Sequence, residues 1–161
     1  MSRAHVALGS NLSSPRIQIA RAFDALEALP GTRLLARSSL YLSAPISEIP
    51  QPDYVNAAAL LETSLSPLDL LDALFAIEAC FGRVRSLPNA PRTLDLDLLL
   101  YDDRFLSDDR LKIPHPRMHE RLFVLLPLLE IDPDCEIPGI GRAADLIGAL
   151  GNQTIAKVTP C

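Results

Sequence analysis

The segment Ala90–Tyr101 places two aspartates inside an otherwise apolar run. Asp95 and Asp97 alternate with leucines at 94, 96 and 98, and the run continues to Tyr101. Such a run is typical of a buried β-strand, in which successive side chains point to opposite faces. Both carboxylates should therefore project from one face of a strand whose other face is packed with leucine.

Two neighbouring carboxylates in a water-poor setting repel each other and lose hydration, so they call for a cation. Mg²⁺ typically binds one or two carboxylates together with phosphate oxygens. Arg92, three residues before Asp95, could add positive charge to the same ligand. The alternative is that one aspartate caps a loop and the other is solvated, because a D-x-D pattern is short. The apolar surroundings favour the metal.

Composition and charge indicate a single domain over residues 1–161 with small-molecule ligands. The chain is 48% hydrophobic and 22% charged, which is typical of a compact protein. Its formal net charge of −5 disfavours a general nucleic-acid surface, so no nucleic-acid partner is expected. Eight of the fifteen Lys and Arg residues nevertheless lie between residues 82 and 121, a distribution that suits a nucleotide phosphate chain.

The cysteines and the apolar runs bear on location. Cys80, Cys135 and Cys161 are odd in number and lack C-x-x-C spacing, which indicates a reducing compartment rather than a zinc site or a disulfide framework. Cys80 lies in an apolar helical pattern and is expected in the core. The sequence shows no signal-peptide pattern and no run of membrane-spanning length, so we expect a cytoplasmic protein without a membrane partner. We also expect a monomer, although these patterns do not bear on oligomeric state.

Periodicity and turn signals define the element order. Pro15 after Ser14, and Pro67 after Ser66, mark helix starts, whereas Gly31 and Gly82 mark helix ends. The expected elements are a strand at 6–9, a helix from 15, β-structure at 34–42, a strand at 54–63, a helix from 67 and the aspartate strand. This order predicts an α+β fold with a ferredoxin-like βαββαβ core. Additional C-terminal helices are expected at 122–131 and 143–150.

Two basic segments could contact phosphates. Arg83 and Arg85 lie in a loop after a helix, and such a loop can close over developing negative charge. The alternative is a solvated basic loop. His115 lies between two prolines, which disfavour one helix across His115 and His119 and hence a helical zinc pair. We therefore expect His115 to donate a hydrogen bond to a phosphate.

Tyr54 and Asn56 lie two residues apart on an expected strand and so share a face. An aromatic wall beside an amide suits a planar heterocycle that is recognised along its edge. The alternative is that Tyr54 is a half-buried packing residue. The sequence lacks the P-loop G-x-x-x-x-G-K-[ST] and the G-x-S-x-G motif, so phosphate transfer would rely on arginines, His115 and metal.

Five segments, in this order, resemble the 6-hydroxymethyl-7,8-dihydropterin pyrophosphokinase family. They are Ala7–Leu12, Gln51–Ala58, Gly82–Arg85, Pro91–Asp97 and Ile113–Arg121. The resemblance implies a ferredoxin-like fold and a Mg²⁺-dependent enzyme of folate biosynthesis with two ions and ATP as co-substrate. It would transfer pyrophosphate from ATP to the hydroxymethyl group of the pterin and release AMP.

The resemblance also implies individual roles. Arg83, Arg92, Asp95 and Asp97 match catalytic positions, and the two aspartates match the ligands of the ions. The positions that match contacts to ATP are Arg85, Arg92, Leu98, Arg110, Leu111, Lys112, His115 and Arg121. The positions that match contacts to the pterin are Asn11, Ser43, Ala44, Ile46, Tyr54, Asn56 and Phe123.

Phe75, Asn89 and Pro116 depart from the best-known bacterial pattern, and the loop before Pro91 is one residue shorter; both differences bear on substrate affinity. Two other functions fit parts of the pattern. A nucleotidyltransferase also uses paired aspartates on a ferredoxin-like palm, and a binding module could share the fold without catalysis. The product formed from ATP distinguishes the three functions.

Overall fold

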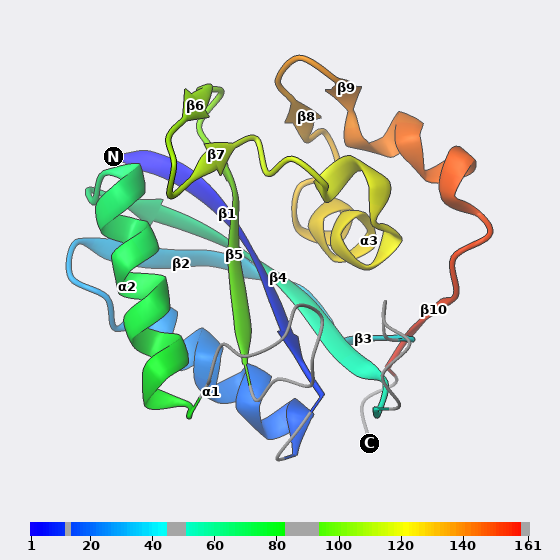
Figure 1. Ribbon diagram of the computed structural model, residues 1–161, viewed down its shortest axis with the longest axis horizontal. Helices are drawn as coiled ribbons and strands as arrows, with labels where there is room; N and C mark the ends of the chain where they lie inside the picture. Colours follow the sequence, from blue (N-terminus) through cyan, green and yellow to red (C-terminus); the bar gives the residue numbers. More distant parts are fainter. Residues whose placement is uncertain (12–13, 45–50, 83–93, 159–161) are drawn as a thin grey trace.

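The computed structural model describes residues 1–11, 14–44, 51–82 and 94–158. Its centre is a six-stranded antiparallel sheet with strand order β10-β3-β4-β1-β5, in which β2 also pairs with β4 (Figure 1). The strands are β1 (Ser2–Ser10), β2 (Thr32–Arg37), β3 (Tyr41–Ser43), β4 (Tyr54–Thr63), β5 (Asp95–Tyr101) and β10 (Ile155–Lys157).

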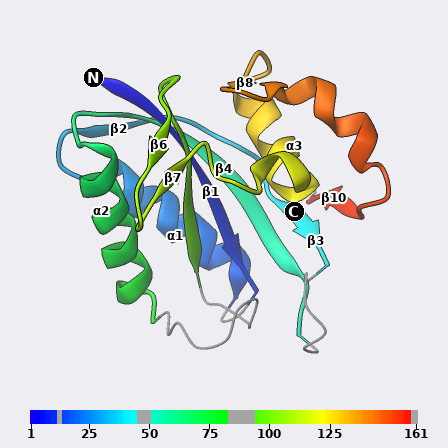
Figure 2. The same cartoon turned by 45° about the horizontal axis from the view of Figure 1, so that its top comes forward.

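Helices cover both faces of this sheet. α1 (Pro15–Glu27) and α2 (Pro67–Cys80) lie on one face, whereas α3 (Leu122–Ile131) and the 3-10 helix η2 (Ala143–Leu150) lie on the other (Figures 1 and 2). The smaller elements are η1 (Met118–Glu120) and two hairpins, β6 (Leu106–Ser107) with β7 (Lys112–Ile113) and β8 (Glu136–Ile137) with β9 (Gly141–Arg142). Within the described ranges, every helix is too short or too polar to cross a bilayer.

Most elements begin where the sequence predicts. In α2, the Ser66 side chain accepts a hydrogen bond from Asp69 N at 3.2 Å and thereby caps the helix. In α1, Ser14 occupies the predicted cap position but has φ 61°, and its side chain does not cap the helix within the described residues. α3 coincides with its predicted range, whereas 143–150 forms a 3-10 helix.

The predicted β-structure at 34–42 is divided into β2 and β3, and Ser38 lies at the division. Ser38 N donates to Ala58 O at 2.9 Å, and the Ser38 hydroxyl accepts from Ala58 N at 2.8 Å. The serine side chain thus replaces a backbone acceptor of the ladder. The chain can therefore leave β2 and start β3 without losing its pairing to β4.

Cys80 is exposed, so its prediction as a core residue is wrong. The buried stripe of α2 runs through Leu70, Leu71, Leu74 and Ile77 and continues with Glu78. Cys80 lies about 200° around the helix from Glu78, at 100° per residue, and so faces away from the sheet.

The prediction that leucines 94, 96 and 98 share the packed face is confirmed, since all three belong to the core under α1 and α2. The register of β5 against β1 then shifts, because Val6 pairs with Leu98 and His5 with Leu100. The extra residue, Leu99, forms a bulge. Leu99 and Leu100 belong to the core under α3.

A buried carboxylate from α2 supports the outer edge of β5. Glu78 is 2% exposed, and its Oε2 accepts from Leu96 N at 2.8 Å. Leu96 lies between the two aspartates, and β5 is the last strand of the sheet order. Glu78 therefore satisfies a backbone donor at an edge and fixes the strand at the position of Asp95 and Asp97.

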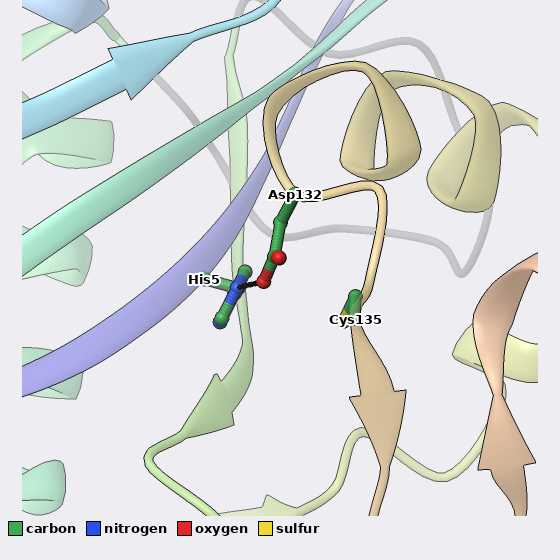
Figure 3. Close-up of side chains that lie close together, drawn as sticks. All are labelled: His5, Asp132 and Cys135. Carbon is green, nitrogen blue, oxygen red and sulfur yellow. Dashed lines mark hydrogen bonds and ion pairs between the residues drawn. The ribbon is translucent and has the colours of Figure 1, made fainter.

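A second buried contact joins β1 to the end of α3. His5 Nε2 and Asp132 Oδ2 are 2.8 Å apart (Figure 3). One nitrogen, oxygen or sulfur atom from each of His5, Asp132 and Cys135 lies within 4.8 Å of the others. Burial raises the pKa of the Cys135 thiol to about 12, so the thiol stays protonated at neutral pH. We interpret the cluster as a structural link between the sheet and the α3 layer.

Replacing Glu78 tests the support of β5. Glu78→Ala should lower the free energy of unfolding by about 2 kcal/mol, because it leaves the buried Leu96 N–H without this acceptor. Glu78→Gln keeps an acceptor oxygen and should cost about half as much. Urea unfolding measures both, with the exposed Asp24→Ala on α1 as control. Equal stabilities for Glu78→Ala and the control would refute the assignment.

The burial of His5 predicts how stability depends on pH. Burial lowers the pKa of His5 below 6.5, with Asp132 partly opposing this effect. As the pH falls, His5 is therefore protonated in the unfolded chain before it is protonated in the folded protein. Its contribution to the free energy of unfolding is fully present above pH 6.5 and declines as the pH falls below that value. The decline from this group cannot exceed about 1.4 kcal/mol per pH unit. Urea unfolding at pH 7.5 and 5.5 should show a smaller decline for His5→Asn than for the wild type, and identical declines would contradict this.

Candidate functional site

The antiparallel register brings the predicted carboxylates and the predicted amide into one row. On β1, Gly9 pairs with Asn56 of β4 on one side and with Asp95 of β5 on the other. Ala7 of β1 pairs with Asp97 in the same way. Residues two apart on a strand share a face, so these side chains all face the α3 side of the sheet.

A pocket lies over this row, and we call it the central pocket. It encloses about 630 Å³ of empty space, including the part open to solvent, which is in the range of small-molecule sites. Its lining comes from β1, β3, β4, β5 and the start of α3: Ala7, Leu8, Gly9, Ser43, Ala44, Tyr54, Asn56, Asp95, Asp97, Arg121, Phe123 and Val124. The structure thus brings together eight predicted site residues from four distant segments.

The amide of Asn56 has a fixed orientation. Its Nδ2 donates to Ser43 Oγ at 2.6 Å and faces the backbone carbonyl of Tyr41 at 3.4 Å. The amide oxygen is therefore directed over Gly9, where a Cβ would lie 3.7 Å from Asn56 Oδ1 and 3.7 Å from the Tyr54 ring. The glycine keeps the floor of the pocket open, and Asn56 presents an acceptor above it.

Two aromatic rings from different elements line the pocket. Tyr54 begins β4, and Phe123 lies in the first turn of α3. The Arg121 guanidinium lies over the Phe123 ring, 5.6 Å from its centroid. The start of α3 therefore presents an apolar ring and a positive charge to the same space.

His115 lies outside the pocket lining but within electrostatic range of it. Its backbone N donates to Leu99 O at the β5 bulge at 2.9 Å, and its Nδ1 accepts from Arg117 N at 3.2 Å. The pKa of His115 is lowered to about 4, mainly by burial and also by the charges of Arg121 and Arg117, which Asp95 partly opposes. At neutral pH the ring is thus uncharged, with its proton on Nε2. It can donate from that atom.

Other predicted residues lie away from the central pocket. Asn11 is buried, and its Nδ2 donates to Gln51 Oε1 at 2.7 Å and to Pro52 O at 3.0 Å, so it holds the segment before Tyr54.

Leu98 and Leu111 are buried under α1 and α2, so a ligand could reach only their backbone. Arg110 pairs with Asp72 of α2, and Lys112 is exposed on β7. The predicted Ile46, Arg83, Arg85 and Arg92 lie outside the described residues.

Sequence reasoning missed the pocket residues Ala7, Leu8, Gly9 and Val124, and it missed Glu78 as a support of β5. The roles of Gly9 and Ala7 can be recognised only when the pairing register is known. The register places these two small residues opposite Asp95 and Asp97, where they leave room for the pocket. Glu78 had a signal in the sequence. It lies four residues after Leu74 and therefore on the same face of the helix.

Solved structures with low sequence identity share this fold. A Plasmodium falciparum HPPK-DHPS triple mutant matches with a TM-score of 0.74 at 14% identity, over 92% of this chain and 43% of that chain. The wild-type protein of the same name in complex with pteroate matches with a TM-score of 0.72 over 92% of this chain and 42% of that chain. At this identity the likeness concerns the fold alone.

Sequence relatives are much closer. A Pseudomonas aeruginosa protein named 2-amino-4-hydroxy-6-hydroxymethyldihydropteridine pyrophosphokinase is 52% identical over 98% of both chains. A Haemophilus influenzae protein of the same name is 45% identical over 99% of this chain and 100% of its own. The family model for 7,8-dihydro-6-hydroxymethylpterin-pyrophosphokinase (HPPK) matches residues 5–133. Together with the sheet and the central pocket, these matches establish that the chain belongs to the 7,8-dihydro-6-hydroxymethylpterin-pyrophosphokinase family.

Proposed function

We propose that this protein transfers pyrophosphate from ATP to the hydroxymethyl group of 6-hydroxymethyl-7,8-dihydropterin and releases AMP, as a step of folate biosynthesis. The hydroxyl oxygen of the pterin would attack the β-phosphorus of ATP and lose its proton. The bond from the β-phosphorus to the oxygen of the α-phosphate would break. The observation that carries the proposal is that aromatic, amide, carboxylate and arginine side chains line one pocket. The family membership supports it.

The aromatic side of the central pocket suits a pterin. The rings of Tyr54 and Phe123 would enclose its flat heterocycle, and the Asn56 oxygen would accept a hydrogen bond from an N–H on its edge. Ser43 holds the Asn56 amide in that orientation. Excluding water from the stacked ring would strengthen this polar contact.

The acidic side of the pocket suits a metal-bound triphosphate. Asp95 and Asp97 are half-buried and offer hard oxygen donors from the same strand face, a donor set that fits Mg²⁺. Two Mg²⁺ ions, as expected for the family, would neutralise phosphate charge and orient the phosphates when bound. Arg121 would contact the phosphates from the α3 side, and His115 would donate to them from Nε2. The chain itself would then contribute positioning and electrostatics rather than a covalent intermediate.

We also propose that the chain acts as one domain with a ferredoxin-like core. The strand order β3-β4-β1-β5 with α1 and α2 on one face supports this description. β10 pairs with β3, so the C-terminal segment belongs to the same sheet. We propose that the protein has no nucleic-acid partner, because its substrates are small molecules and its net charge is −5.

Replacing either aspartate should abolish most of the activity. With ATP, Mg²⁺ and the hydroxymethyl dihydropterin, the wild type should form AMP, and Asp95→Asn and Asp97→Asn should each lower kcat on the order of a thousandfold, which corresponds to about 4 kcal/mol. Chromatography of the nucleotide products measures this. The exposed Asp103→Asn in the turn after β5 is the control. ADP or released pyrophosphate as the product, or near-wild-type rates for both aspartate variants, would exclude the proposed reaction.

Filling the floor of the pocket should exclude the pterin. A side chain at Gly9 would point between Asn56 and Tyr54 at ordinary contact distance, so Gly9→Val should fold but raise the pterin KM at least tenfold. Gly148→Val is the control, since a Cβ at Gly148 meets nothing within 4 Å. Steady-state kinetics with varied pterin and saturating ATP measures the effect. An unchanged KM in a folded Gly9→Val variant would show that the pterin binds elsewhere.

A further inference from the structure

The helix that carries Phe123 begins without a cap from its own chain segment. Arg121 occupies the N-cap position of α3, and an arginine side chain offers only donors, so it cannot accept a hydrogen bond from the first N–H groups. Gln153 takes this role from 31 residues further along the chain. Its Oε1 accepts from Leu122 N at 2.8 Å, and its Nε2 donates to Glu120 O at 2.8 Å. The two bonds bracket Arg121 on both sides.

Gln153 is itself held in place by the sheet. Its backbone N donates to Leu150 O at 3.0 Å, at the end of η2. Two residues later the chain enters β10, where Ile155 pairs with Ser43 of β3, and Val158 N donates to Leu40 O at 2.7 Å. Figure 2 shows this segment passing from the α3 layer to the edge of the sheet at β3. Gln153 therefore ties the first turn of α3 to a strand rather than to a loose tail.

The same segment lies directly behind the central pocket. Leu122, Gln153, Thr154 and Ile155 line a second hollow, which shares Ser43, Ala44 and Phe123 with the central pocket. Phe123 thus separates two spaces, and one of them is bounded by Gln153. A change in the first turn of α3 would move the Phe123 ring in the central pocket.

We propose that Gln153 is a positioning residue for the pterin site. It acts through the backbone of Glu120 and Leu122, which fixes where the Phe123 ring and the Arg121 charge face the pocket. The role rests on the proposed pterin substrate. Gln153 lies beyond residues 5–133, the part that the family model matches. The C-terminal segment is then part of the binding machinery rather than an appendage.

The test compares Gln153→Ala, Gln153→Asn and Gln153→Glu with the exposed neighbour variant Asn152→Ala, all in the full chain. Alanine removes both bonds, and asparagine is one CH₂ too short to make both. Glutamate keeps an acceptor for Leu122 N but cannot donate to Glu120 O, and its second oxygen would repel that carbonyl. Fluorescence titration with 6-hydroxymethylpterin gives the Kd. Steady-state kinetics gives the pterin KM and kcat, and thermal unfolding shows that each variant is folded.

Gln153→Ala and Gln153→Asn should raise the Kd and the pterin KM about tenfold, while kcat at saturating substrates changes less than about threefold. Gln153→Glu should raise the Kd and the pterin KM as well, by about tenfold, because it loses the bond to Glu120 O, and Asn152→Ala should match the wild type. Binding within twofold of the wild type in folded Gln153→Ala, Gln153→Asn or Gln153→Glu overturns the role. If the wild type binds no pterin, both this inference and the proposed function are wrong. If the wild type binds pterin and the folded Gln153 variants bind it equally well, only the role of Gln153 is wrong.

Discussion

The pairing of β1 with its two neighbours is the constraint on which the rest of the site depends. One register places Gly9 between Asn56 and Asp95, and Ala7 beside Asp97. A slip of one residue would turn the carboxylates toward α1 and α2, into a core of leucines, where burying them would be costly. The hydrophobic pattern on one face therefore fixes the polar pattern on the other. The small residues of β1 then leave room for a ligand.

The acidic strand is stabilised from outside the pocket. Glu78 accepts from Leu96 N on the edge of β5, so the strand that carries two carboxylates depends on a third, buried one. Asp95 and Asp97 face the pocket, where two neighbouring negative charges repel each other unless positive charge or a cation lies near them. Arg121 adds a positive charge to the pocket lining. A triphosphate with bound cations would therefore contact groups of both charges there. The lining of the pocket therefore suits a charged ligand.

Local signals in the sequence predicted the elements well. Ser-Pro starts, glycine stops and apolar stripes gave α2, α3 and β4 within one or two residues, because these signals act over a single turn or strand. The same signals missed the division of β2 from β3. The Ser38 hydroxyl takes the place of a backbone acceptor only because Ala58, 20 residues away, lies opposite it. They also misplaced Cys80, which lies past the end of the buried stripe.

The candidate site was predictable where chemistry shows in short motifs, as for Asp95, Asp97, Tyr54 and Asn56. The parts set by tertiary contacts were not. Gly9 and Ala7 required the register, and Gln153 required the path of the C-terminal segment back to β3. Their roles come from residues distant in sequence, which no local pattern records.

The α3 face of the sheet has two parts with different requirements, and the bulge at Leu99 separates them. Before the bulge, Asp95 and Asp97 face a pocket that must stay open. After it, Leu100 pairs with His5 in a closed core under α3. The Leu99 carbonyl at the bulge accepts from His115 N, so the irregularity that ends the pocket also fixes the histidine beside it. One extra residue in β5 thus lets a single strand serve both the binding site and the core that supports it.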